Sequence, residues 1–241
     1  MNTEIKVKFS DIIIGISSHS SYLKRFCRDY LSDGEPAFSV SATDEQINDE
    51  IRNANAPITF DHAESLCVYR EIAEMLPLYD RVVFHGAAIE YGGKAYIFTA
   101  PSGTGKTTHI NLWKQYIGDK VKIINGDKPI ISLTDGRITV CGTPYAGKEG
   151  LQTNISAEIF GICFLSQGED NKITAISPKD AFIKLYLQTY KPQTEEAVRK
   201  TFEIIRTLCT ISCFSLSCDM TEQAVKTSFE ALTKEKYGER Q

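Results

Sequence analysis

The chain has 241 residues, of which 42% are hydrophobic and 24% are charged. This composition is typical of a globular protein with a hydrophobic core, and the length suits one large domain or one domain with an appendage. The net charge of −4 argues against nucleic acid or an anionic membrane as a partner, because an acidic protein is not attracted to either. No apolar run is long enough to span a bilayer and the first residues do not resemble a signal peptide, so we expect a cytoplasmic protein.

The seven cysteines are scattered through apolar segments, and their number is odd. Both features favour reduced, buried thiols over a disulfide framework. Three of them, Cys209, Cys213 and Cys218, lie close together near the C-terminus. They form no CxxC pair and no histidine is nearby, so the alternation around Cys213 favours a half-buried strand over a metal site.

The first 60 residues give weak signals and are interpreted as an N-terminal extension (1–60) packed on the main domain (61–241). Within the extension we expect a strand over 9–16, a short helix over 20–31, a strand over 37–40 and a polar helix over 44–53.

The main domain begins with a predicted helix over 62–75, which Pro77 ends, and a strand over 81–90. The turn Tyr91-Gly92-Gly93-Lys94 joins that strand to the next one, 95–99, as a hairpin. The strand at 95–99 is therefore predicted to pair antiparallel with its predecessor, which is unusual for a strand that leads into a P-loop.

The remaining segments predict a mixed α/β domain. Strands are expected at 121–125, 130–133, 137–141, 159–165, 173–176 and 211–216, and helices at 178–189, 195–209 and 221–234.

The most informative motif is Ala100-Pro101-Ser102-Gly103-Thr104-Gly105-Lys106-Thr107, between the strand at 95–99 and a helix that begins near Thr108. It fits a P-loop, with Ala where the strict pattern has Gly. Residues 102–108 (Ser102, Gly103, Thr104, Gly105, Lys106, Thr107 and Thr108) are predicted to bind ATP, with backbone N–H groups around the phosphates. Lys106 would reach the β- and γ-phosphates and Thr107 would hold Mg²⁺. The alternative is a glycine-rich turn without a ligand.

Two further residues are candidates near the phosphates. Asp127 follows the apolar strand at 121–125 and is predicted to be the second Mg²⁺ ligand, against the alternative of a turn aspartate before Pro129. His85 is predicted to lie near the phosphates or the metal, and a core histidine is the equal alternative.

The second glycine-rich loop, Gly142-Thr143-Pro144-Tyr145-Ala146-Gly147-Lys148-Glu149-Gly150, supplies Lys148 as a candidate contact to the transferred phosphoryl group. Glu149 could contact the metal, and Lys128 is a further candidate for the phosphates. The alternative is a surface loop with solvated charges.

The ordered set His85-Gly86, the P-loop and Asp127 resembles the HPr kinase/phosphorylase and ATP-dependent PEP carboxykinase superfamily. Asp127-Lys128-Pro129, Gly142-Thr143-Pro144 and Gly147-Lys148 look most like the small HPr kinase-like proteins of bacteria, some of which phosphorylate a peptide serine. The resemblance covers about residues 62–190 and implies a mixed-sheet P-loop kinase domain with His85, Lys106, Asp127 and Lys148 as catalytic residues. A decarboxylase site is not expected, because a carboxykinase is much longer.

The chain departs from the family at two positions. HPr kinase has two adjacent aspartates at the strand end, where this chain has Gly126 before Asp127, and it has Glu where this chain has Thr108. The expected function is an ATP- and Mg²⁺-dependent kinase whose acceptor is a serine hydroxyl on a peptide or small protein. Two alternatives stay open: a nucleotide-binding sensor or scaffold, and a kinase of a small metabolite. The acceptor, the nucleotide base and homo-oligomerisation are also left open.

Overall fold

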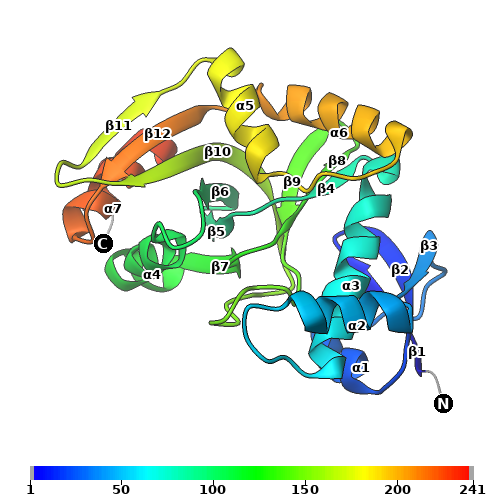
Figure 1. The fold of residues 1–241 in the computed structure, drawn as a ribbon. Helices are drawn as coiled ribbons and strands as arrows, with labels where there is room; N and C mark the ends of the chain where they lie inside the picture. Colours follow the sequence, from blue (N-terminus) through cyan, green and yellow to red (C-terminus); the bar gives the residue numbers. More distant parts are fainter. Residues whose placement is uncertain (1–2, 239–241) are drawn as a thin grey trace.

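The computed structural model describes residues 3–238 and contains two β-sheets with helices around them (Figure 1). The smaller sheet is N-terminal, with β1 (Thr3–Phe9), β2 (Ile12–Ser18) and β3 (Phe38–Ser41) in that order. β1 pairs antiparallel with β2, and β2 pairs parallel with β3. The predicted strand over 9–16 is confirmed only for residues 12–16, which lie in β2, because the chain turns at Ser10, whose φ of 57° is left-handed.

Three helices pack on this sheet: α1 (Tyr22–Phe26), α2 (Asp44–Asn53) and α3 (Phe60–Met75). Short 3₁₀ turns follow α1 at Arg28–Tyr30 and α3 at Leu76–Tyr79. The predicted helix over 44–53 is confirmed, and a capping box between Thr43 and Gln46 fixes its start. The predicted helix over 20–31 is shorter than expected.

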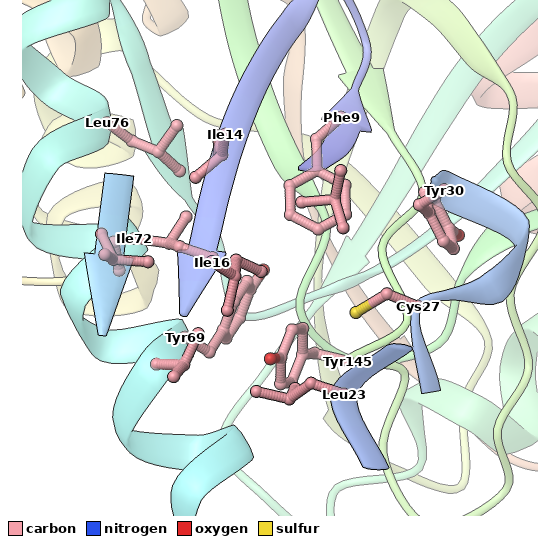
Figure 2. Packing of buried hydrophobic residues seen from close by; sticks show 14 of the residues in the cluster. Phe9, Ile14, Ile16, Leu23, Cys27, Tyr30, Tyr69, Ile72, Leu76 and Tyr145 are labelled. Atoms are coloured by element: carbon pink, nitrogen blue, oxygen red, sulfur yellow. The ribbon is translucent and has the colours of Figure 1, made fainter. Parts of the chain in front are cut away.

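The N-terminal hydrophobic cluster continues past residue 60. Ile72 lies on the buried side of α3, and Leu76 directly follows the helix. Both pack in the same cluster as Phe9, Ile14 and Ile16 (Figure 2). The boundary between an extension (1–60) and a main domain (61–241) stays a prediction.

The larger sheet has nine strands and is mixed and curled (Figure 1). Its main order is β4-β8-β9-β10-β6-β5-β7, and β12, with β11 beside it, pairs along β10. The strands are β4 (Arg81–Val83), β5 (Ala87–Tyr91), β6 (Lys94–Thr99), β7 (Val121–Asn125), β8 (Ile130–Thr134), β9 (Arg137–Cys141), β10 (Ser156–Gln167), β11 (Lys172–Ala175) and β12 (Cys213–Cys218).

The long strand β10 explains the curl. Its first residues, Ser156 to Glu158, pair with β9, and Ile162 to Gln167 pair with β12. β6 pairs parallel with β10, and the register shifts by one residue between Ile159 and Gly161. A register shift of this kind bends a strand and increases its twist, so two groups of strands diverge from β10.

Helices cover both faces of this sheet (Figure 1). Helices α5 (Pro178–Gln188) and α6 (Glu195–Leu208) cover one face, and α4 (Lys106–Ile117) and α7 (Glu222–Thr233) cover the other. The alternation of side chains along β6 shows why: Ala95 and Ile97 belong to the cluster under α5 and α6, whereas Tyr96 and Phe98 belong to the cluster under α4 and α7. Among residues 3–238, no helix is both long and apolar enough to cross a bilayer.

The predicted hairpin into the P-loop strand is confirmed, because β5 pairs antiparallel with β6. The single predicted strand over 81–90 is wrong. β4 pairs with β8 at one end of the sheet and β5 pairs with β6 and β7 near the other, so Phe84 to Gly86 cross between them. This crossing carries His85 to the site described next.

Candidate functional site

The P-loop leaves the carboxyl end of β6 and leads into α4. Gly103 (φ 80°) and Gly105 (φ 108°) adopt left-handed backbone conformations that side-chain-bearing residues rarely reach. Lys106 is the first residue of α4, and its Nζ donates a hydrogen bond to the carbonyl oxygen of Ala100 (3.0 Å). The ammonium group therefore lies across the loop, and burial lowers its pKa, with a further lowering from Lys128.

The loop borders a cavity of about 480 Å³, which we call the phosphate cavity. Three segments far apart in the sequence converge on it: the P-loop, the turn after β7 and the second glycine-rich loop. The lining residues are Ser102, Gly103, Gly105, Lys106, Thr107, Thr108, Gly126, Asp127, Ala146, Gly147, Lys148 and Glu149. Of the site residues predicted from the sequence, His85, Thr104 and Lys128 do not line it.

Asp127 is held in place by Asn125, the last residue of β7. The Oδ1 of Asn125 accepts hydrogen bonds from the backbone N–H groups of Asp127 and Lys128 (2.8 Å each). Its Nδ2 donates to the carbonyl oxygen of Thr143 (2.9 Å), so the fully buried amide also ties the turn to the second loop. The sequence analysis missed Asn125, although a polar residue at the end of an apolar strand was a usable signal.

Asp127 lies between two nitrogen-bearing side chains. Its Oδ1 is 3.5 Å from Nε2 of His85, and its Oδ2 is 3.2 Å from Nζ of Lys128. The other ring nitrogen of His85, Nδ1, is 2.9 Å from Oε1 of Gln188. Burial lowers the pKa of His85 below its usual 6.5, and the positive charge of Lys106 lowers it further. The imidazole is therefore neutral near pH 7. In the tautomer with Nδ1–H donating to Gln188, Nε2 carries the lone pair that can accept a proton.

The backbone around His85 joins three segments of the chain. The N–H of His85 donates to the carbonyl oxygen of Gln188 (2.8 Å), and the hydroxyl of Thr99 donates to the carbonyl oxygen of His85 (2.7 Å). The N–H of Gly86 donates to the carbonyl oxygen of Asp127 (2.9 Å). These bonds fix His85 beside the end of the P-loop strand. No sequence signal indicated Gln188, which lies 103 positions away.

The second glycine-rich loop is anchored in the N-terminal cluster by Tyr145. Figure 2 shows its ring beside Tyr69, Leu23 and Cys27, and the rings of Tyr145 and Tyr69 stack with centroids 3.7 Å apart. The hydroxyl of Tyr145 donates to the carbonyl oxygen of Ser65 (3.0 Å). The next residues reach the phosphate cavity, where Lys148 is exposed and Glu149 accepts a hydrogen bond from Asn111 (3.4 Å).

The oxygen donors in the cavity suit Mg²⁺ held partly by phosphate. Thr107, Asp127 and Glu149 line the same space. Mg²⁺ commonly takes one or two protein carboxylates and completes its shell with water and substrate phosphates. Residues 3–238 contain no cluster of three or more His, Cys, Asp or Glu side chains that could hold a metal.

A second cavity of about 400 Å³, the side cavity, lies on the opposite flank of the P-loop. It shares Gly103, Gly105 and Thr108 with the phosphate cavity. The carboxyl ends of β10 and β12 and apolar side chains such as Leu112 form its walls. Clefts at the carboxyl ends of parallel strands are the usual ligand sites of α/β sheets.

Comparisons with known proteins give little beyond this geometry. No protein-family model matches the chain, and no curated protein matches it in sequence. Among solved structures, the chain is similar to the HPr(Ser) kinase/phosphatase from Coxiella burnetii, with 9% identity and a TM-score of 0.37 over 63% of this chain and 93% of that chain. A likeness this distant says nothing about the roles of individual residues.

Proposed function

We propose that the protein is an ATP- and Mg²⁺-dependent kinase that transfers the γ-phosphoryl group to a serine hydroxyl of a peptide or small protein. The observation that carries the proposal is the convergence of the P-loop, Asp127 and the Lys148 loop on the phosphate cavity, with His85 beside Asp127. The resemblance of these ordered motifs to HPr kinase-like proteins supports the same reading.

Lys106 and Lys148 neutralise phosphate charge in this proposal. Lys106 exchanges its bond to Ala100 for the β- and γ-phosphates, and the free backbone N–H groups at the start of α4 face the same oxygens. Lys148, exposed at the cavity wall, contacts the group in transfer. Phosphoryl transfer depends mainly on this positioning and charge neutralisation.

Thr107 and Asp127 would hold the Mg²⁺. A bound Mg²⁺ would supply positive charge that offsets the negative charge developing on the phosphate oxygens. Lys128, 3.2 Å from Asp127, would keep that carboxylate oriented.

His85 receives the proton of the acceptor. The serine Oγ forms a bond to the γ-phosphorus, the bond from that phosphorus to the β,γ-bridging oxygen breaks, and the hydroxyl proton passes to Nε2 of His85. The products are ADP and the phosphoserine. The imidazolium formed lies between Oε1 of Gln188 and the Asp127 carboxylate, two acceptors that stabilise it.

The nucleoside part of ATP would lie in the side cavity. The two cavities share the glycines of the P-loop, so a nucleotide with its phosphates in one can extend its ribose and base into the other. The apolar wall that Leu112 and Leu165 provide suits the face of a base.

Gly126 favours a second candidate, a nucleotide-binding sensor or scaffold without transfer. A Cβ at this position would lie 3.2 Å from the carbonyl oxygen of Ala146 and 3.4 Å from that of Leu151. The backbone of the second loop therefore leaves little room for a carboxylate at the position where HPr kinase carries one. In HPr kinase that carboxylate is the base near the acceptor hydroxyl. Without it, transfer here relies on His85 or Asp127 as the base, or on positioning and charge neutralisation alone.

The first test of the proposal is Lys106→Ala. We expect ATP turnover to fall by about 10²–10³-fold, because a preorganised cation facing the transition-state charge is lost. ATP affinity, measured by calorimetry, should weaken with it.

Gln115→Ala is the matched control, since Gln115 is exposed on the same helix α4 and lines neither cavity. ATP turnover in Lys106→Ala equal to that in Gln115→Ala would contradict the P-loop assignment. Tight ATP binding by the unmodified protein without transfer to any acceptor would favour the sensor or scaffold.

A further inference from the structure

A third cavity, of about 360 Å³, is lined by His85 and by no residue of the P-loop. It is formed between α3 and residues 187–190, which are the end of α5 and the two residues after it. We call it the α3 cavity. Its volume is at the lower end of the range for ligand sites, which suits a few side chains and excludes a folded domain.

The α3 cavity and the phosphate cavity meet at Asp127. His85 and Lys128 line the α3 cavity, and both lie within 3.5 Å of the Asp127 carboxylate in the phosphate cavity. An acceptor bound in the α3 cavity would therefore lie beside His85 and close to Asp127, next to the space proposed for the phosphates. Transfer also requires the attacking and leaving oxygens to lie in line on opposite sides of the phosphorus.

The walls of the α3 cavity are mainly aromatic and aliphatic. Tyr69 is stacked on Tyr145, and its hydroxyl donates to the carbonyl oxygen of Lys128 (2.7 Å), so this wall is rigid. Tyr190 closes another side, and Leu187 lies at the rim with 60% of its surface exposed. An exposed leucine beside an apolar cavity suits an occupant that continues past the rim.

The two basic side chains that line the α3 cavity are Arg70 and Lys128, and among the described residues no Asp or Glu lines it. Each cation has one acidic partner outside the lining, Glu50 for Arg70 and Asp127 for Lys128. A neutral or acidic occupant is therefore favoured over a basic one.

We propose that the α3 cavity is the acceptor site and binds a peptide segment whose apolar or aromatic side chain adjoins the serine, with an acidic residue near it. This inference rests on the proposed kinase function and names its substrate class. The apolar side chain enters between Tyr69 and Tyr190, the serine hydroxyl reaches His85, and the acidic residue lies near Arg70. The peptide continues over Leu187.

The test compares substitutions of two exposed aliphatic residues on one helix. Leu187 and Ile183 both lie on α5 and are each 60% exposed, but only Leu187 lines the α3 cavity. A library of short serine-containing peptides, with varied residues on both sides of the serine, is offered with ATP and Mg²⁺. We expect the unmodified protein to select peptides with an apolar neighbour and an acidic residue.

With the selected peptide, Leu187→Glu should lower kcat/KM for the peptide by about tenfold or more, because it removes apolar contact and adds repulsion. The Kd for ATP should not change. Ile183→Glu should stay within about twofold of the unmodified protein in both quantities. Equal effects of the two substitutions, or selection of basic peptides, would overturn the proposal.

Hydrogen exchange separates this proposal from the kinase function itself. Peptide binding without nucleotide should protect the backbone amides of residues 66–73 and 187–190. Protection there without phosphate transfer would support the acceptor site and count against the kinase. Transfer without protection would overturn the acceptor site and leave the kinase standing. Failure of every library member to bind or to accept phosphate would also overturn the acceptor site.

Discussion

At the scale of the residue, His85 gives the most specific prediction about the chemistry. Its pKa lies below the usual 6.5 because the ring is partly buried and Lys106 is positively charged. A base must be neutral to accept a proton, so activity should stay level above about pH 6.5 and fall as the pH drops through the lowered pKa. His85→Gln should reduce kcat by about 10²-fold and remove this acidic limb from the pH profile.

The control for this substitution is His62→Gln, because His62 is exposed and lines none of the three cavities. It should leave both kcat and the pH profile unchanged. An acidic limb that persists in His85→Gln would show that another group accepts the proton.

The same scale shows what the sequence could and could not predict about the site. The P-loop residues and Asp127 were predicted because each lies in a short pattern beside a strand end, and all of them except Thr104 line one cavity. Gln188 could not be found, because its contact with His85 depends on how α5 packs over the sheet. Asn125 was missed because its amide makes hydrogen bonds to backbone groups, including the carbonyl oxygen of Thr143, which only folding brings close to it.

At the scale of the element, one hydroxyl joins α4 to α7. The fully buried Oγ of Ser228 on α7 accepts from Nε1 of Trp113 (2.9 Å) and lies 3.0 Å from Nε2 of His109, both on α4. It donates in turn to the carbonyl oxygen of Ala224 (3.0 Å). Ser228→Ala leaves two buried donors without a partner, so the free energy of unfolding should fall by about 3 kcal/mol.

Urea denaturation measures this loss. Lys226→Ala is the control, because Lys226 is exposed on the same helix and its replacement also introduces alanine. If the two variants have equal stability, the hydroxyl does not join the helices in the way described.

Elements with local signals were predicted well, and those that depend on distant partners were not. The capping box of α2 and the glycines of the β5–β6 turn fix their elements within a few residues of sequence. The run from Arg81 to Glu90 has the pattern of one apolar strand. Its first part pairs with β8 and its last part pairs with β6, so the run forms two separate strands. Hydrophobic pattern alone does not show which partner a strand finds.

At the scale of the whole molecule, a buried neutral histidine makes stability depend on pH. His109 is 3% exposed, and burial lowers its pKa from 6.5 to about 4. The unfolded chain binds a proton at this residue below about pH 6.5, and the folded chain does not until about pH 4. The stabilisation is therefore complete above pH 6.5 and declines as the pH falls.

When the pH is lowered from 7 to 5, His109 should reduce the free energy of unfolding by about 2 kcal/mol. His109→Gln removes the titrating group, so its stability should fall by about 2 kcal/mol less than that of the unmodified protein over the same interval. Urea denaturation at the two pH values checks this. An equal fall in both proteins would mean that His109 is not buried as a neutral ring.

The whole architecture was predictable only in class. A mixed α/β fold follows from the sequence, but the branching of the sheet at β10 does not, because it requires one strand to pair with β9, β6 and β12. The role of Tyr145 in joining the phosphate cavity to the N-terminal cluster also depends on packing across the molecule.

The central claim is that this fold carries out Mg²⁺-dependent phosphoryl transfer. The most direct test is transfer of labelled γ-phosphate from ATP to the serine peptide library, with and without Mg²⁺, by the unmodified protein, Lys106→Ala and Asp127→Asn. We expect transfer by the unmodified protein that requires Mg²⁺ and is lost in both variants. Transfer that persists in either variant, or that proceeds without Mg²⁺, would contradict the account.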